Sequence, residues 1–223
     1  MELYVVIVAG GSGKRMGAEI PKQFLELAGR PVLMHTIERF KSFNDTIEII
    51  TVLPENQLRH WIELQKQYSF KVPQTLVKGG SHRFFSVRNG LKFVSDSGLV
   101  AIHDGVRPFV SLDTIKRCFD TAEKLGNAIP AISPTESLRI LTDQGSVPVN
   151  RMHVKQIQTP QVFNAGLIKR AYLQEYKFEF TDDAIVLEKT GEKINIIEGN
   201  RENIKITNPE DLLISTALLP TVS

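Results

Sequence analysis

A glycine-rich segment flanked by cations follows the first apolar run and is the part of the chain best suited to chemistry. Leu3–Val8 leads into Ala9-Gly10-Gly11-Ser12-Gly13-Lys14-Arg15-Met16-Gly17, and Pro21-Lys22-Gln23 comes shortly after. Glycines let the backbone approach a ligand closely and turn its N–H groups toward it. Arg15 and Lys22 add positive charge, so the pattern predicts a site for the phosphates of a nucleotide.

Two well-known phosphate-binding patterns do not fit this loop. A Walker A loop requires Ser or Thr after its lysine, whereas Arg15 follows Lys14. The dinucleotide fingerprint requires glycine at the sixth position counted from Gly11, where Met16 stands. A helix expected from Pro31 also replaces the second strand and its terminal acid. A nicotinamide-dependent oxidoreductase is therefore only a remote alternative.

Two further segments place polar residues after expected strands. Gly79-Gly80-Ser81-His82-Arg83-Phe84-Phe85-Ser86 opens a helix and suits an anion or the edge of a base, although Arg83 and Ser86 fit a surface charge and a helix-stabilising hydroxyl equally well. In His103-Asp104-Gly105-Val106-Arg107, Asp104 is suited to hold Mg²⁺, to accept from a sugar hydroxyl, or to pair with Arg107. His103 is interpreted as a structural hydrogen-bonding residue.

The elements that must position these residues alternate along the chain. Strands are expected at Leu3–Ala9, Thr46–Leu53, Thr75–Val77, Leu99–His103, Ala128–Ile132 and Lys193–Ile197. Helices are expected at Pro31–Phe40, Gln57–Tyr68, His82–Val94, Leu112–Leu125, Ala165–Glu175, Asp182–Thr190 and Pro209–Leu219. Ser111 and Asn208 are the candidate caps of the helices that follow them. This alternation predicts an α/β fold with a doubly wound, mostly parallel sheet covered by helices on both faces.

The alternation stops at Pro134. The runs Ser137–Thr142 and Val147–Arg151 flank Asp143-Gln144-Gly145, which suits a tight turn. We expect a β-hairpin arm at about residues 135–155 that projects from a single domain spanning residues 1–223.

Composition narrows the classes of partner. The chain has 223 residues, a formal net charge of +2 and no clustered Lys/Arg, which argues against nucleic acid. Its one cysteine, Cys118, lies in an amphipathic segment and is expected to be a buried structural thiol. The first apolar run is too short to span a membrane and lacks the features of a signal peptide, so a cytoplasmic location without a membrane partner is expected.

Taken together and in order, these motifs resemble those of the 2-C-methyl-D-erythritol 4-phosphate cytidylyltransferase family. The first motif is shared with sugar-nucleotide pyrophosphorylases, and the later ones restrict the resemblance to polyol-phosphate cytidylyltransferases: Pro21-Lys22-Gln23, Gly79-Gly80 with Arg83, His103-Asp104 with Arg107-Pro108, Thr159-Pro160-Gln161, Thr181-Asp182-Asp183 and Asn203-Ile204-Lys205-Ile206-Thr207. The resemblance covers nearly the whole chain and implies a Rossmann-like fold of the nucleotide-diphospho-sugar transferase type. Ribitol-5-phosphate cytidylyltransferase is the nearest alternative, although Glu198-Gly199-Asn200 and Asn208–Leu212 look more like the methylerythritol enzymes.

The resemblance also implies a reaction and a set of roles. The 4-phosphate of methylerythritol attacks the α-phosphorus of CTP in the presence of Mg²⁺, which the triphosphate mostly holds, with Asp104 close to the metal. The roles implied are catalytic for Arg15, Lys22, Arg151 and Lys205, nucleotide binding for Ala9, Gly10, Gly11, Ser12, Gly13, Gly80, Arg83 and Ser86, and substrate binding for Asp104, Arg107, Ser137, Thr159 and Thr181. Arg151 is expected to act across a homodimer interface formed by the arm. Ser137 stands where the family often has threonine, and Phe85 stands where a polar residue is expected.

Overall fold

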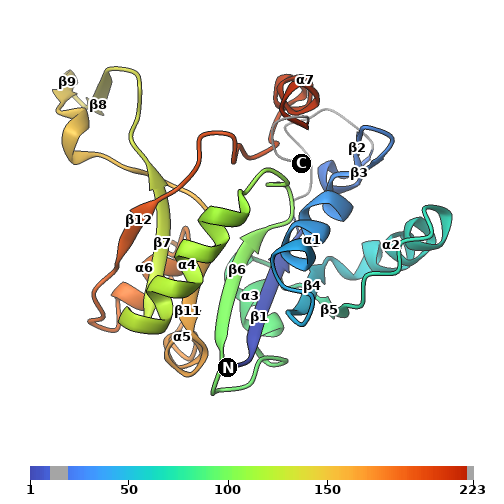
Figure 1. Ribbon diagram of the computed structural model, residues 1–223. Helices are drawn as coiled ribbons and strands as arrows, with labels where there is room; N and C mark the ends of the chain where they lie inside the picture. Colours follow the sequence, from blue (N-terminus) through green and yellow to red (C-terminus); the bar gives the residue numbers. More distant parts are fainter. Residues whose placement is uncertain (11–19, 220–223) are drawn as a thin grey trace.

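A mainly parallel sheet forms the centre of the chain (Figure 1). The computed structural model describes residues 1–10 and 20–219. Within them the sheet contains β1 (Leu3–Val8), β4 (Glu48–Leu53), β5 (Thr75–Lys78), β6 (Leu99–Asp104), β7 (Asn127–Ile132), β10 (Gln156–Ile157), β11 (Gln161–Asn164) and β12 (Ile196–Glu198). Their order is β10-β7-β11-β6-β1-β4-β5, and β12 pairs with β7. β1 is parallel to β4 and β6, whereas β11 is antiparallel to β6 and β7.

Helices cover both faces of this sheet, as the sequence predicts. One face carries α1 (Val32–Phe43), α2 (Glu55–Gln67) and α4 (Leu112–Leu125), and the other carries α3 (Arg83–Leu91), α5 (Ala165–Ala171) and α6 (Asp183–Glu188). Successive residues of a strand point to opposite faces. Val5 and Ile7 accordingly pack in the first core cluster, and Tyr4 and Val6 pack in the second. Burial on both sides explains why the strands are apolar almost throughout.

Several local predictions are confirmed. Helix α4 has the expected bounds, and the Ser111 hydroxyl caps it by accepting from the Thr114 N–H at 3.1 Å. The last helix, α7 (Pro209–Leu218), begins with the Asn208 cap and packs beside the short hairpin of β2 (Glu26–Leu27) and β3 (Arg30–Pro31). Cys118 is fully buried, and burial raises the pKa of its thiol to about 12. Among the described residues, no helix has both the length and the apolarity needed to cross a membrane.

Other local predictions are wrong. Strand β11 was not expected, because its four residues begin and end with polar side chains and only its pairing with β6 and β7 makes it a strand. The helix expected at Ala165–Glu175 ends at Ala171. The strand expected at Lys193–Ile197 begins only at Ile196, since the Asn127 side chain bonds the Lys193 carbonyl and the Asn195 N–H instead.

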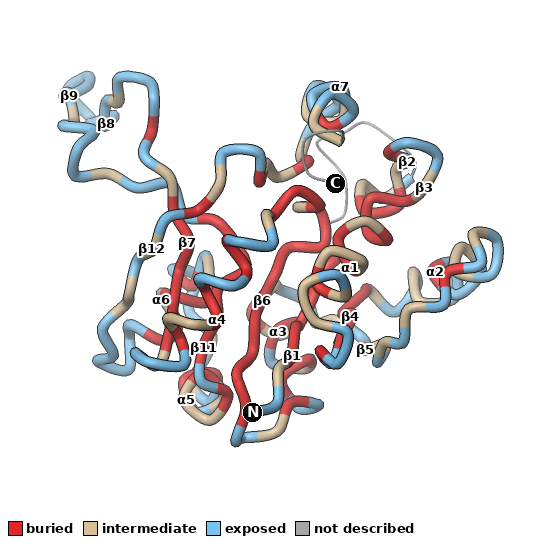
Figure 2. The backbone as a smooth tube through the Cα atoms, viewed as in Figure 1, coloured by how far each residue is buried: buried red, intermediate tan, exposed pale blue. Residues whose placement is uncertain are grey.

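The predicted arm is present and extends away from the sheet. It consists of β8 (Leu138–Thr142) and β9 (Gly145–Val149), which pair with each other in a separate two-stranded sheet. The second arm strand ends before the predicted Arg151, which instead opens a 3-10 helix, Arg151–His153. Figure 2 shows the arm as almost entirely exposed, in contrast to the buried strands of the body.

Candidate active site

Two adjoining cavities lie beside the carboxyl ends of β1 and β6, where ligands of open α/β sheets bind. Each has a volume of about 220 Å³, and both are lined by Arg83, Asp104 and Lys205. The first is also lined by the predicted catalytic residue Lys22 and by four residues of the predicted nucleotide site, namely Ala9, Gly10, Gly80 and Ser86. The second is lined by residues of the predicted substrate site, namely Arg107, Thr159 and Thr181. Apart from the residues of this shared wall, the two neighbouring cavities take their predicted lining residues from different sets.

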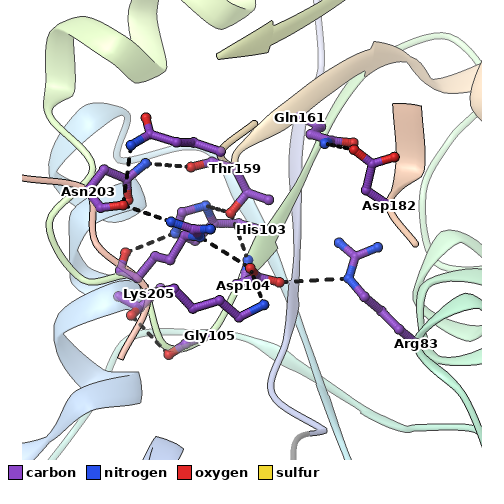
Figure 3. Close-up of polar contacts among 12 residues, drawn as sticks. Arg83, His103, Asp104, Gly105, Thr159, Gln161, Asp182, Asn203 and Lys205 are labelled. Carbon is purple, nitrogen blue, oxygen red and sulfur yellow. Dashed lines mark hydrogen bonds and ion pairs between the residues drawn. The ribbon is translucent and has the colours of Figure 1, made fainter. Parts of the chain in front are cut away.

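Three cations converge on Asp104 in that shared wall (Figure 3). Its Oδ2 lies 2.9 Å from Lys205 Nζ and 3.2 Å from Arg107 Nε, and its Oδ1 lies 3.7 Å from Arg83 Nε. Burial by itself raises the pKa of Asp104, but the charges of the three cations outweigh burial and hold that pKa well below its usual value. The carboxylate is therefore ionised at neutral pH, and the ion pair with Arg107 that the sequence left open is present.

His103 and Thr159 hold the loop that carries Asp104. The Thr159 hydroxyl accepts from the Asp104 N–H at 3.1 Å and lies 2.9 Å from His103 Nδ1, while His103 Nε2 lies 3.0 Å from the Arg107 carbonyl. Burial lowers the pKa of His103 to about 4. Since the carbonyl can only accept, Nε2 carries the proton of the neutral ring and Thr159 donates to Nδ1. His103 is structural, as predicted, and both of its ring nitrogens are occupied.

Arg83 is bonded to a buried acid, Asp183, for which the sequence predicted no role in the site. Its Nη1 and Nη2 donate to the two carboxylate oxygens of Asp183 at 2.7 and 2.6 Å. Tyr172 donates its hydroxyl to the same carboxylate at 2.5 Å. The helix that carries this acid begins one residue later than the expected Asp182, because the Asp182 side chain caps α6 and Asp183 is its first residue. Its spacing to the buried residues Val186 and Leu187 puts it on the inner face of α6, which was the available signal.

The loop between β5 and α3 is closed by Ser86. Its hydroxyl accepts from the Gly80 N–H at 3.0 Å and donates to the His82 carbonyl at 3.2 Å. A Cβ on Gly80 would lie 2.3 Å from the Cβ of Phe85, so only glycine fits there. Of the alternatives left open, Ser86 does stabilise the start of the helix, whereas Arg83 is not a simple surface charge.

The remaining predicted residues lie in three places. Lys22 opens a 3-10 helix, Lys22–Phe24, and lines the first cavity. Ser137 and Arg151 are exposed residues of the arm and line neither cavity, and Arg151 donates to the Thr135 carbonyl at the base of the arm. Gly11, Ser12, Gly13 and Arg15 lie outside the described residues. The cavities also include His82, Gln158 and Asp182, for which no ligand contact was predicted.

The donor groups suit a divalent cation that is held mainly by phosphate. Within residues 1–10 and 20–219 there is no group of three or more His, Cys, Asp or Glu side chains that could hold a metal ion. Asp104 offers one ionised carboxylate at the wall between the cavities. Mg²⁺ commonly binds to one or two carboxylates and takes its other ligands from water and substrate phosphates. The residues present therefore fit Mg²⁺ that arrives with a triphosphate.

Cation-lined, adjoining cavities at this edge of a Rossmann-like sheet can bring two anionic substrates together, which is the arrangement of a nucleotidyltransferase. Comparison with known proteins agrees. A model of the 2-C-methyl-D-erythritol 4-phosphate cytidylyltransferase family matches residues 3–221. The chain belongs to this family.

Individual relatives match over almost their full length. The enzyme of that name from Bacteroides thetaiotaomicron is 51% identical over 98% of this chain and 100% of its own, and one from Clostridium perfringens is 39% identical over 94% and 95%. Among solved structures, 4-diphosphocytidyl-2C-methyl-D-erythritol synthase from Anaerococcus prevotii has a TM-score of 0.83 at 31% identity and covers 98% of this chain and 96% of its own. The cytidylyltransferase from Thermus thermophilus has a TM-score of 0.80 at 28% identity, with 98% of each chain covered.

Proposed function

We propose that this chain joins CTP and 2-C-methyl-D-erythritol 4-phosphate to give 4-diphosphocytidyl-2-C-methyl-D-erythritol and pyrophosphate, a step of non-mevalonate isoprenoid biosynthesis. The observation that carries this conclusion is the pair of cavities that share Arg83, Asp104 and Lys205. Family membership decides against ribitol phosphate as the co-substrate and against an oxidoreductase.

The reaction exchanges one phosphorus–oxygen bond for another. An oxygen of the methylerythritol phosphate attacks the α-phosphorus of CTP, the bond to the β-phosphate oxygen breaks, and pyrophosphate leaves with that electron pair. The nucleophile is already ionised, so no general base is required. This agrees with a buried His103 whose ring nitrogens are both occupied. Such transfers depend mainly on in-line positioning and on neutralising charge.

The cations divide between the two substrates in our proposal. Lys22, with Arg15, stabilises the charge that develops on the α-phosphate, beside the first cavity. Lys205 orients the attacking phosphate from the shared wall, where its Nζ contacts Asp104. Asp104 and Arg107 position the methylerythritol hydroxyls, with Thr159 and Thr181 lining the same cavity. Mg²⁺, held by the triphosphate and Asp104, would neutralise charge on the phosphates.

The arm supports a proposal of homodimerisation. Ile140, Leu141, Val147 and Met152 are large apolar side chains exposed on it. A group of such side chains is typical of a protein–protein contact. Pairing through the arms would carry Ser137 and Arg151 to the second cavity of the partner subunit, which explains why neither reaches a cavity within one chain.

The remaining expectations also stay proposals. A single domain over residues 1–223 is supported by the pairing of β12 with β7 and by the Ile206 N–H, which donates to the Val106 carbonyl at 3.0 Å. A cytoplasmic location is supported by the substrates, since a nucleoside triphosphate and a sugar phosphate are highly charged. The absence of clustered Lys/Arg in the sequence supports a function without nucleic acid.

Substitution of Lys22 tests the catalytic part of the proposal. Because Lys22 would act on charge that develops during the reaction, Lys22→Ala should lower kcat by about 10²-fold or more. The Kd for CTP should change by less than about tenfold. Pyrophosphate release and CTP titration give the two values, and Lys66→Ala, at an exposed site on α2, is the control. Unchanged turnover in Lys22→Ala would overturn the role.

A further inference from the structure

A larger cavity is lined by residues of α3 and α5. In Figure 1, α5 lies at the end of the sheet away from the arm and α7. The cavity has a volume of about 730 Å³, and none of its lining residues lines either active-site cavity. Small-molecule sites commonly enclose about 300–1,000 Å³ and combine an apolar wall with a few polar groups. The size therefore suits an organic molecule rather than a bare inorganic anion.

The charged side chains of this cavity are strongly unbalanced. Arg88, Lys92, Lys169 and Arg170 line it together with one acid, Asp96. Asp96 is paired with Lys169, whose Nζ also donates to the Val94 carbonyl at 2.8 Å. Within the described residues, the other three cations make no ion pair with an acid. Cations that share a concave surface attract anions more strongly than isolated surface charges do.

The remaining wall is apolar, and one of the cations is held in place beside it. Leu91 and Tyr172 are buried, and Leu173 is an exposed apolar side chain at the edge. The Arg88 guanidinium lies 4.9 Å from the centre of the Phe85 ring, an interaction that orients a cation. A single ligand could therefore place an anionic group next to the cations and a hydrocarbon group against the leucines.

We infer that this cavity is a regulatory site that binds an organic phosphate or diphosphate with an apolar group. Tyr172 connects it to the active site, because Tyr172 lines the cavity and donates its hydroxyl to Asp183. Asp183 in turn holds both terminal nitrogens of Arg83, in the wall shared by the two active-site cavities. A ligand that shifts Tyr172 changes how firmly Arg83 is held. The regulatory part rests on the proposed function, whereas the binding part does not.

Binding is tested with three probes: geranyl diphosphate, inorganic pyrophosphate and geraniol. By calorimetry, geranyl diphosphate should bind more tightly than either fragment, and Arg170→Ala/Lys92→Ala should weaken its binding by about tenfold or more. Lys124→Ala, an exposed control on α4, and Lys205→Ala, in the active site, should leave its binding unchanged. The site would be overturned if geranyl diphosphate showed no saturable binding, or if inorganic pyrophosphate bound equally well. It would also be overturned if Lys205→Ala, and not the double variant, lost the binding of geranyl diphosphate.

Regulation is tested by pyrophosphate release with and without saturating geranyl diphosphate. The probe should change kcat/KM of the wild type by about fivefold or more, within the usual range of coupling between sites. The change should be absent from the double variant, and also from Tyr172→Phe, which keeps the ring and still binds the probe. No change in the wild type would overturn the regulatory role. A wild type without basal activity would instead contradict the proposed function and leave the binding result intact.

Discussion

The cluster around Asp104 and the hairpin arm differ in how far one chain satisfies their side chains. Asp104, His103 and Asp183 are buried, and each is bonded to partners from distant parts of the sequence. In the arm, Leu141 and Met152 are 84% and 78% exposed, and β8 and β9 pair with each other rather than with the central sheet. The chain alone thus organises the cluster, whereas the arm exposes apolar side chains that a partner subunit would cover in the proposed dimer.

Under the proposed dimerisation, this difference distinguishes the functional groups that one subunit positions from those that need a partner subunit. Preorganised charges lower a barrier because they need not be rearranged during the reaction. The cluster meets that condition within one subunit. Arg151 would be held in place before the reaction only if the arm is fixed against a partner subunit. Substitutions in the two regions should therefore have different consequences.

The largest effect is expected from Lys205→Ala. This change removes the cation that contacts Asp104 at 2.9 Å and, in our proposal, orients the attacking phosphate. We expect kcat/KM to fall by about 10³-fold, near the upper end of what the loss of one stabilising group costs. Steady-state pyrophosphate release measures it, and far-ultraviolet circular dichroism checks that the variant is folded. A loss of less than about tenfold would show that the cluster does not act on the reaction.

The next effect concerns stability and pH. Burial lowers the pKa of His103 from 6.5 to about 4, so between these values the unfolded chain binds more protons than the folded one. The free energy of unfolding should therefore fall as the pH decreases from 6.5 to 4, with a contribution from His103 on the order of 3 kcal/mol. Urea unfolding of the wild type and His103→Gln at both pH values isolates that contribution. Equal pH dependence in the two proteins would contradict it.

A smaller effect is expected from Arg151→Ala. Loss of a charged contact to phosphate costs about 1.5–3 kcal/mol, so kcat/KM for methylerythritol phosphate should fall by roughly 30-fold. The free energy of unfolding should stay close to that of the wild type, because Arg151 is exposed.

Mixing Arg151→Ala with Lys205→Ala tests whether Arg151 acts across the interface. Half of randomly re-formed dimers would be mixed, and each would have one intact site, which restores about a quarter of wild-type activity. Failure to regain activity, with subunit exchange demonstrated separately, would place Arg151 in its own subunit's site.

The smallest effect on the free energy of unfolding is expected from Leu141→Ser. Because Leu141 lies at an exposed position of the arm, the free energy of unfolding should change by no more than about 0.5 kcal/mol. Dimerisation should nevertheless weaken, which sedimentation at several concentrations would detect. If Leu141→Ser lowered the free energy of unfolding and left dimerisation unchanged, the contrast between the two regions would be wrong.

Much of the fold could be predicted because its signals are local. The apolar runs of β1 and β6, the Ser111 cap and the turn between β8 and β9 each depend on neighbouring residues. Strand β11 could not be predicted in this way, since its four residues are a strand only because β6 and β7 lie on either side. The strand β12 was expected, but its late start at Ile196 depends on the side chain of Asn127, which is distant in sequence.

The sequence by itself determined the order of the motifs, the α/β alternation and thereby the family. It also indicated that Lys22, Asp104 and Lys205 belong to one site. Only the tertiary structure decided that three cations meet on Asp104 and that Asp183, 100 residues away from Arg83, holds that arginine in place. Motifs follow from the types and spacing of neighbouring residues, whereas these ion pairs depend on which strand ends and helices the folded sheet brings together.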